Sequence, residues 1–373
     1  GKTYVGSRVV SSLVNKGYKI GIASNSHKAI NNILEKVIEV MDEDNVHGSI
    51  ARIHSGQDDL YDNPRIKLYK NIRKAEFNEE QKIYAGVAWT FANELMSDEL
   101  DYLLIDEAGQ VSLANMVGMS RSCKNLILMG DQMQLSQPTQ GIHPEDSGVS
   151  CLDYLLGELA TVPEDKGILL PDSYRLNSDI CAFISSRVYE GRLASKESAN
   201  RRKLHLNKSD LIKKSSGISY LSVSHQGNEQ SSFEEVSVIK NLVKELLAGK
   251  KEDEKGNLES IEAEDILIVS PYNHQIKLLQ ETLGAKFEIG TVDKFQGREA
   301  PIVIISMAAS DIESAPRGAE FLLERNRLNV ALSRAQTLAM LIASPELNQP
   351  KASSSAEMSL VNFYMDLVNY SMS

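Results

Sequence analysis

The apolar and polar positions of the chain form a repeated unit: a short apolar run, a polar turn, and a longer stretch whose apolar residues recur at helical spacing. In the first half, this pattern predicts helices over residues 4–16 and 27–40, and strands over residues 19–23, 49–54, 83–89, 102–105 and 125–129. Strands that alternate with helices in this way indicate βαβ crossovers. We therefore expect an α/β fold with a mainly parallel sheet.

The same unit returns in the second half of the chain and predicts a second sheet. Its strands are expected over residues 167–170, 217–223, 265–270, 287–292, 301–307 and 338–343, with helices ending near residue 189 and over residues 233–248, 274–283 and 324–334. We expect one domain over residues 1–163, a second over residues 164–350, and a helical tail over residues 351–373.

Two highly charged stretches interrupt the repeated unit. Residues 41–82 are expected to form a small insertion that leaves the sheet after the strand at 49–54 and continues as an exposed helix. Residues 250–264 are expected to be a mobile connection, because charged and turn-forming residues dominate them.

The apolar run at 102–105 ends directly in Asp106-Glu107. Ligands of open α/β sheets bind at the carboxyl ends of the strands, and two carboxylates there are suited to a bound cation with phosphates. Taken alone, the pair is equally typical of a solvated acidic turn. Other predicted strands also end in Ser, Thr, Asp or Gln, as at Gly130-Asp131-Gln132. This repetition favours a ligand site along the edge.

Composition narrows the class of protein. The 373 residues suffice for two or three domains, and no apolar run approaches the roughly 20 residues of a membrane span. The three cysteines are odd in number and far apart, which predicts neither a disulfide framework nor a zinc site and favours a cytoplasmic setting. The net charge of −11 argues against a protein that coats nucleic acid over its whole surface, but not against a locally basic groove.

The chain opens with Gly1-Lys2-Thr3 before a predicted helix. This tripeptide matches the end of the phosphate loop G-x-x-x-x-G-K-[ST], in which Lys contacts the β/γ-phosphates and Thr holds magnesium. The first glycine and the preceding strand of that motif are absent. We therefore expect a fragment that begins inside the motif. In the longer protein, the upstream part is expected to carry the rest of the phosphate loop and an accessory barrel, and a nuclease domain or subunit is a further candidate.

In their order along the chain, the motifs resemble those of superfamily 1 helicases. The strings that carry the resemblance are Gly1-Lys2-Thr3, Ser24-Asn25-Ser26-His27, Asp106-Glu107-Ala108, Gly130-Asp131-Gln132-Met133-Gln134-Leu135, Ser173-Tyr174-Arg175, Val292-Asp293-Lys294-Phe295-Gln296-Gly297-Arg298-Glu299 and Arg327-Leu328-Asn329-Val330-Ala331-Leu332-Ser333-Arg334-Ala335. The last two point to the 1B branch, which includes the nonsense-mediated-decay helicase, senataxin and the replication nuclease-helicases. The segment 24–34 looks closest to the nuclease-helicase type. The resemblance extends from residue 1 to about 344 and implies two RecA-like domains, each a mainly parallel sheet flanked by helices.

The resemblance implies an ATP hydrolase that uses Mg²⁺ and acts in the cleft between its two domains. It implies the following roles: ATP contacts by Gly1, Lys2, Thr3, Tyr174, Gly297 and Glu299; magnesium ligands Thr3 and Asp106; and catalytic groups Glu107, Gln134, Arg175 and Arg334. Glu107 would activate the attacking water, Gln134 would sense the γ-phosphate, and the two arginines would stabilise the transferred phosphoryl group.

The resemblance also implies a helicase or translocase on single-stranded nucleic acid. By position in the motifs, Ser26, Thr90, Pro271 and Thr291 would lie along the bound strand. DNA is favoured over RNA and movement from 5′ to 3′ is implied, although the residues themselves show neither. Relatives usually place Pro sooner after Leu than this chain does at residues 134–138, which leaves the geometry of that loop open.

A different class of protein remains as an alternative: a helicase-like scaffold that binds nucleic acid or a partner without turnover. The presence of the full set of polar groups that ATP hydrolysis needs favours the helicase enzyme, because a non-catalytic scaffold has no need of a carboxylate pair and two arginines at these motif positions. These groups are Lys2, Asp106, Glu107, Gln134, Arg175 and Arg334.

Overall fold

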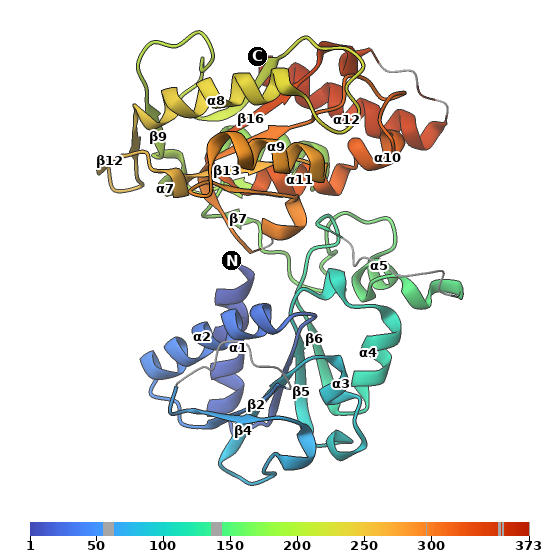
Figure 1. The fold of residues 1–373 in the computed structure, drawn as a ribbon. Helices are drawn as coiled ribbons and strands as arrows, with labels where there is room; N and C mark the ends of the chain where they lie inside the picture. The colour runs from blue at the N-terminus through green and yellow to red at the C-terminus, as the bar shows by residue number, and fades with distance from the viewer. Residues whose placement is uncertain (55–62, 136–143, 296, 350–351, 353, 373) are drawn as a thin grey trace. The chain divides into compact units, whose positions relative to one another are not determined.

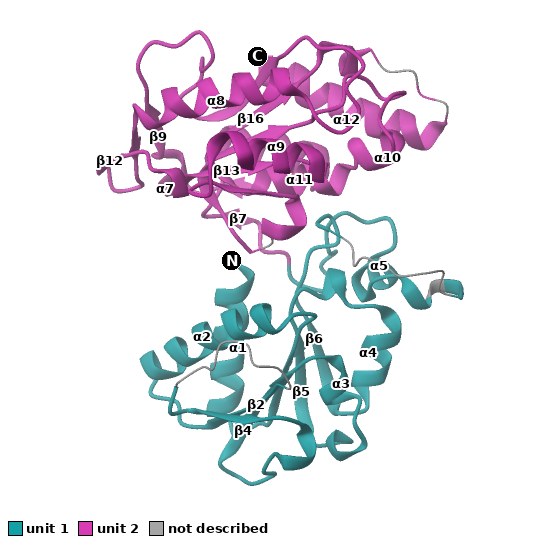
Figure 2. Cartoon of the chain, viewed as in Figure 1, with its two compact units in different colours: residues 1–168 teal, residues 169–373 magenta. Residues whose placement is uncertain are grey.

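The computed structural model describes residues 1–54, 63–135, 144–295, 297–349, 352 and 354–372. The chain divides into two compact units, residues 1–168 and 169–373 (Figure 2). None of the helices in the described part combines the length and the apolar character that crossing a bilayer requires.

Unit 1 is built on one parallel six-stranded sheet with the order β3-β2-β4-β1-β5-β6 (Figure 1). Its strands are β1 Ile20–Ala23, β2 Ser49–Ile53, β3 Ile66–Tyr69, β4 Gln81–Gly86, β5 Leu100–Ile105 and β6 Cys123–Leu128. The helices are α1 Lys2–Asn15, α2 His27–Glu43, α3 Ala88–Phe91, α4 Leu113–Ser120 and α5 Cys151–Leu156, with short 3-10 turns Ile72–Lys74, Glu94–Met96, Ala108–Gln110 and Glu145–Gly148.

The central strands of unit 1 become apolar toward their carboxyl ends, as at residues 103–105 of β5, because both faces of the sheet are buried there. Ile22 and Leu104 pack with α1 and α2 on one face, while Leu103 and Ile105 pack with Phe91 on the other. The carboxyl ends of all six parallel strands consequently meet at one edge, where the turns that follow them are free to carry polar side chains.

Unit 2 has a parallel five-stranded sheet with the order β10-β16-β15-β13-β14. These strands are β10 Gly217–Ser222, β13 Ile266–Val269, β14 Glu288–Gly290, β15 Ala300–Ser306 and β16 Ala335–Ala343. Helices α8 Phe233–Leu247 and α9 Asn273–Leu283 share one apolar core with the sheet. The remaining helices are α6 Ser178–Val188, α7 Glu197–Asn200, α10 Gly318–Leu322, α11 Arg325–Ser333 and α12 Ser355–Met372, and the 3-10 turns are Ala263–Asp265, Val292–Phe295 and Pro345–Asn348.

Two smaller sheets complete unit 2. Strands β9 Lys203–His205, β11 Lys250–Glu252 and β12 Leu258–Ser260 form an antiparallel sheet, and β7 Asp172–Ser173 pairs with β8 Ala194–Ser195.

The predicted fold class, mainly parallel sheets flanked by helices, is confirmed. The prediction placed the domain boundary after residue 163, whereas the two units meet between Ile168 and Leu169.

Four local predictions were wrong. The described residues of 41–82 include two strands of the sheet, β2 and β3; the position of β3 at the sheet edge explains the charged and exposed residues that suggested an insertion. Residues 250–264 contain β11 and β12 rather than only a mobile connection. Residues 167–170 form no strand in the described part, and Ile168 is 88% exposed. The strand predicted over 83–89 ends at Gly86, since α3 follows and buries Phe91 in the core.

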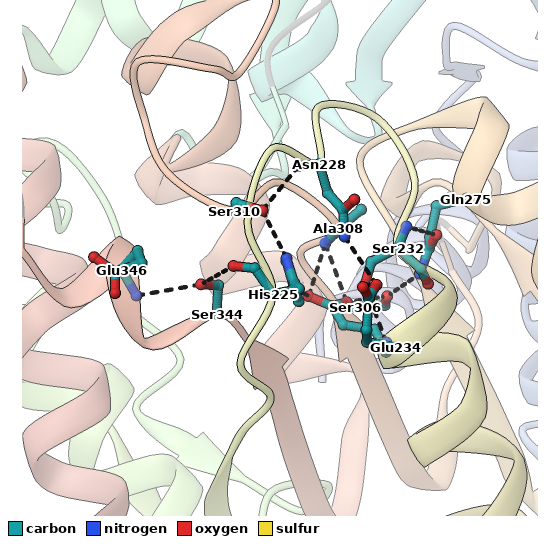
Figure 3. A network of polar contacts seen from close by, with 11 residues as sticks. His225, Asn228, Ser232, Glu234, Gln275, Ser306, Ala308, Ser310, Ser344 and Glu346 are labelled. Atoms are coloured by element: carbon teal, nitrogen blue, oxygen red, sulfur yellow. Dashed lines mark hydrogen bonds and ion pairs between the residues drawn. The ribbon is translucent and has the colours of Figure 1, made fainter.

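A buried carboxylate organises the carboxyl edge of the second sheet. Glu235, on α8, is fully buried and accepts hydrogen bonds from Ser306 Oγ at 2.5 Å and from the backbone N–H of Ala308 at 3.1 Å. His225 Nε2 lies 3.2 Å from its Oε1. Figure 3 shows His225 converging with Ser306 and Ala308, which lie at the end of β15 and just after it. Ala308 adopts φ +64°, so Glu235 also holds a left-handed turn after β15.

We expect Glu235→Ala to lower the free energy of unfolding by about 3 kcal/mol, because it leaves several buried donors without an acceptor. Urea unfolding followed by circular dichroism measures this. The matched control is Glu234→Ala, since Glu234 is exposed and bonds to Asn228 and Ser232. An equal loss of stability in the two variants would contradict the role given to Glu235.

Candidate active site

Two adjacent carboxylates follow strand β5 at the carboxyl edge of the first sheet. Asp106 is 7% exposed, and its backbone N–H donates to the carbonyl oxygen of Ala23, the last residue of β1, at 2.8 Å. Burial, together with the charge of the adjacent Glu107, raises the pKa of Asp106 to about 6. A bound cation would favour the ionised form of such a carboxylate, so this position is suited to a metal ligand.

Glu107 lies next to the start of helix α1. Lys2 Nζ is 3.8 Å from Glu107 Oε2, and the two side chains are 29% and 26% exposed. The backbone of Glu107 has φ +52°, a left-handed conformation that costs energy in a residue other than glycine. The fold therefore brings the lysine predicted to contact phosphate beside the carboxylate predicted to activate water.

The loops after β5 and β6 touch each other through their backbones. A Cβ at position 130 would lie 2.8 Å from the nitrogen of Gly109, so Gly130 permits an approach that another residue would block. In the second loop, Asp131 Oδ2 accepts a hydrogen bond from Gln134 Nε2 at 2.9 Å, and Asp131 Oδ1 accepts one from the N–H of Met133 at 3.0 Å. Asp131 thus holds Gln134 in a loop whose first residues touch the Ala108-Gly109 backbone.

Asp131 was not predicted as a site residue, although it lies inside one of the strings that carry the resemblance. The feature of the sequence that could have revealed this role is the spacing: a carboxylate three residues before Gln134 can accept a hydrogen bond from within the same turn. Residues 136–138 of that motif, and Gln296 of the second-domain motif, lie outside the described residues.

The residues around Lys2 fit a magnesium ion held with a nucleotide. Thr3 follows Lys2 in the first turn of α1, whose N-cap is Gly1. The hydroxyl of Ser24, just beyond the last register pair of β1 and β5, is buried and has no hydrogen-bond partner in the described part of the chain. Within that part, no group of three or more His, Cys, Asp or Glu is placed to bind a metal alone. Magnesium needs no such group when phosphates and water supply most of its ligands.

In unit 2, Arg175 and Glu299 form an ion pair. Glu299 Oε1 also accepts a hydrogen bond from Gln336 Nε2 at 2.8 Å. Arg175 Nη1 donates to the carbonyl oxygen of Ser333 at 3.5 Å, which places it beside Arg334. Three of the predicted site residues, distant in the sequence, therefore lie together. Gln336 was not predicted as a site residue. The feature that could have indicated it is its position directly after Arg334-Ala335, where the motif ends.

The other predicted ATP-site residues of unit 2 differ in exposure. Arg334 is 4% exposed, and its Nη1 donates to the carbonyl oxygen of Arg298 at 3.2 Å. Tyr174 is 62% exposed, with Lys196 Nζ 5.9 Å from its ring centre. Gly297 has φ +76°, a conformation that glycine adopts without strain. Tyr174 thus has a free aromatic surface, whereas Arg334 is largely enclosed.

Two of the four residues predicted to contact nucleic acid lie in unit 1. Ser26 is exposed and caps α2, its Oγ accepting a hydrogen bond from the N–H of Ala29 at 3.1 Å. Thr90 is 5% exposed, and its side chain lies against Gly86, where a Cβ would collide with it. Because Thr90 is buried, the exposed surface at this point of unit 1 is formed by the residues next to it and not by Thr90 itself.

The other two, Pro271 and Thr291, line one pocket of about 190 Å³ at the carboxyl edge of the second sheet. Arg317 and Phe321 contribute to the same pocket, and the guanidinium carbon of Arg317 lies 3.8 Å from the centre of the Phe321 ring. The fold thus gathers a cation, an aromatic ring and two predicted contacts in one hollow.

A model of the AAA domain family matches residues 150–346, which is more than half of the chain. The chain belongs to the AAA domain family. Within this family, the relatives support the type indicated by the motifs, a superfamily 1 helicase of the replication nuclease-helicase type.

Curated relatives of this AAA domain chain include the DNA replication ATP-dependent helicase/nuclease dna2 of Schizosaccharomyces pombe, which is 28% identical over 92% of the chain and 26% of the relative. The human DNA replication ATP-dependent helicase/nuclease DNA2 is 26% identical over 93% of the chain and 35% of the relative. The DNA polymerase alpha-associated DNA helicase A of Schizosaccharomyces pombe is 29% identical over 76% of the chain and 44% of the relative. The chain spans less than half the length of these proteins.

Among solved structures, the complex of Arterivirus nonstructural protein 10 (helicase) with DNA matches 94% of the chain and 59% of its own, with a TM-score of 0.50 and 12% sequence identity. At this identity the likeness concerns the fold alone. It supports the predicted fold, in which each of two domains is a mainly parallel sheet flanked by helices.

Proposed function

We propose that the chain is the motor part of an ATP-dependent helicase or translocase that acts on single-stranded DNA and moves from 5′ to 3′. The observation that carries the proposal is the Lys2–Glu107 contact of 3.8 Å beside the buried Asp106. A phosphate-binding lysine, a carboxylate for the metal and a carboxylate for water are the groups that ATP hydrolysis requires. DNA is proposed as the nucleic acid because the relatives are named as DNA helicases.

In this proposal each group has one task. Lys2 binds the β/γ-phosphates, and Thr3 and Asp106 hold Mg²⁺, which would neutralise charge on the phosphate oxygens. Glu107 orients the attacking water and accepts its proton. Gln134, fixed by its hydrogen bond to Asp131, senses the γ-phosphate.

Unit 2 supplies the remaining groups. Arg175 and Arg334 stabilise the charge that develops on the transferred phosphoryl group, as guanidinium groups do in this reaction. Tyr174 stacks on adenine with its exposed ring, and Glu299 orients Arg175. The bound strand contacts Ser26, Pro271 and Thr291, and it passes the surface around the buried Thr90.

The test is ATP turnover with and without single-stranded DNA and single-stranded RNA. The protein used is the chain together with whatever residues its gene encodes ahead of Gly1. Turnover that needs Mg²⁺ and rises with one polymer supports the proposal and identifies the nucleic acid. A folded protein that binds single-stranded DNA but shows no turnover with either polymer would instead be the non-catalytic scaffold. Unwinding of duplexes with a 5′ or a 3′ overhang tests the direction.

A further inference from the structure

Trp89 is the single tryptophan of the chain and lies in α3, which begins two residues after β4 ends. It is 83% exposed, whereas the next two residues, Thr90 and Phe91, are 5% and 0% exposed. An indole ring has a large apolar surface that folding ordinarily covers. Trp89 is therefore an aromatic surface held in water beside a well-packed core.

The helix that carries Trp89 is firmly anchored. The ring of Phe91 lies over Gly21, so close that a Cβ there would come within 2.9 Å of its Cε1. The side chain of Thr90 lies against Gly86, and its N–H donates to the carbonyl oxygen of Val87 at 2.9 Å. Because its neighbours are fixed, the indole is presented to a ligand with little loss of backbone freedom on binding.

The turn that leads from β4 to Trp89 begins beside the ends of the neighbouring strands. Gly86, the last residue of β4, is in register with Ala23, the last residue of β1, and Ala85 is in register with Arg52 of β2. The turn that leads to Ser26 and the N-terminus of α2 therefore begins beside the turn that leads to Trp89. Ser26 is one of the proposed contacts to the single strand.

The same region carries positive charge in a chain of net charge −11. Arg52 is 2% exposed; its guanidinium donates to Asn31 Oδ1 at 3.2 Å and to the carbonyl oxygens of Ile53 at 2.9 Å and Ala85 at 3.4 Å, and its Nη2 lies 2.9 Å from His27 Nδ1. Burial lowers the pKa of Arg52 to about 10, so it stays a cation at neutral pH. No carboxylate of the described residues pairs with it, and the exposed Lys28 adds a second cation in the first turn of α2.

We propose that Trp89 stacks on one base of the bound single strand, while Arg52 and Lys28 attract the adjacent phosphates. Proteins that bind single strands without reading their sequence combine aromatic rings, on which bases stack, with cations along the path of the phosphates. The proposal rests on the proposed function above. Val117 and Leu95 are also exposed on unit 1, so a surface for a protein partner is the competing explanation that the experiment must exclude.

The experiment uses the intrinsic fluorescence of the 373-residue chain, which reports on Trp89 alone. Titration with a 20-nucleotide oligothymidylate is expected to quench this fluorescence to a saturating level. In parallel, the anisotropy of a fluorescein-labelled copy of the oligonucleotide measures affinity. Trp89→Ala is expected to weaken binding about tenfold, the effect typical of losing one stacked base, while Trp89→Phe retains most of the affinity.

Two control variants separate stacking from other effects. Tyr18→Ala removes an aromatic residue, 38% exposed, from the turn that precedes β1, and should leave the affinity unchanged. Lys28→Ala should lower the slope of log affinity against log salt concentration by about 1 and leave the fluorescence quench in place. Thermal unfolding is expected to be the same for Trp89→Ala and the unchanged chain, because the indole is outside the core.

The outcomes distinguish this proposal from the proposed function. If the chain binds the oligonucleotide, but its fluorescence does not change and Trp89→Ala binds as tightly, the stacking role is overturned and the helicase proposal stands. That result would assign the surface to a protein partner. If the folded chain and all variants fail to bind the oligonucleotide, the proposed function fails with it. If Trp89→Ala does not fold, the stacking role is still tested by the fluorescence quench of the unchanged chain and by the affinity of Trp89→Phe for the oligonucleotide.

Discussion

Replacement of Glu107 by Gln is expected to lower ATP turnover by about 1000-fold, within the range that a general base contributes. The amide keeps the size of the side chain and its place near Lys2, but it cannot accept the proton of the attacking water. ATP binding should persist, since Lys2, Thr3 and Asp106 are untouched. Steady-state hydrolysis in saturating single-stranded DNA measures the first effect, and titration with a fluorescent ATP analogue measures the second.

The matched control for Glu107→Gln is Asp101→Asn on the same strand. Asp101 lies near the amino end of β5 and forms an ion pair of 2.9 Å with Lys124, far along the strand from the Asp106-Glu107 turn. Turnover and nucleotide affinity should be unchanged in this variant. Turnover by Glu107→Gln within tenfold of the unchanged chain would remove Glu107 from its catalytic role.

Arg175→Ala is the second substitution with a large expected effect, a loss of about 1000-fold in kcat. The guanidinium is held by Glu299 and by the carbonyl of Ser333, so it is oriented before nucleotide binds. Its side chain is 39% exposed, so the loss of contacts should cost little stability. The effect should appear in kcat rather than in the KM for ATP, because the charge that it stabilises develops only in the transition state.

Arg187→Ala is the control for Arg175→Ala. Arg187, also in unit 2, is 51% exposed and forms an ion pair of 3.4 Å with Asp366, so the two substitutions remove similar groups from similar environments. We expect Arg187→Ala to keep full turnover and Arg175→Lys to recover only a part, because a lysine cannot reproduce the planar fork of donors. A normal kcat in Arg175→Ala would exclude the arginine from the reaction.

Much of the fold followed from local pattern. Strand β13, residues 300–305 of β15 and residues 102–105 of β5 are continuous apolar runs because both faces of a parallel sheet are covered. Helices α2 and α8 show apolar residues at helical spacing because one face of each is buried. Such elements are determined by burial that repeats along the segment itself, so their type could be predicted without knowledge of their neighbours.

The elements that were missed depend on contacts far along the chain. Strand β11 pairs Lys250 with His205 and with Ser260, and its charged residues show no apolar alternation. Strand β3 is an edge strand whose middle residues, Lys67 and Leu68, are exposed. Short or marginal strands of this kind are stabilised by backbone pairing with a partner strand, which a local pattern does not reveal.

By itself, the sequence determined the α/β class, the succession of strands and helices, and the chemical groups of the candidate site, because periodicity and motif order are properties of neighbouring residues. Only the tertiary structure decided which groups meet: β1 lies between β4 and β5, so the turn that leads to Ser26 lies between the turn that leads to Trp89 and the Asp106-Glu107 turn. It also decided exposure, since packing of Phe91 buries Thr90 and leaves Trp89 in solvent. Contacts such as Lys2–Glu107 and Arg175–Glu299 depend on strand order and crossover, which no short stretch of the chain encodes.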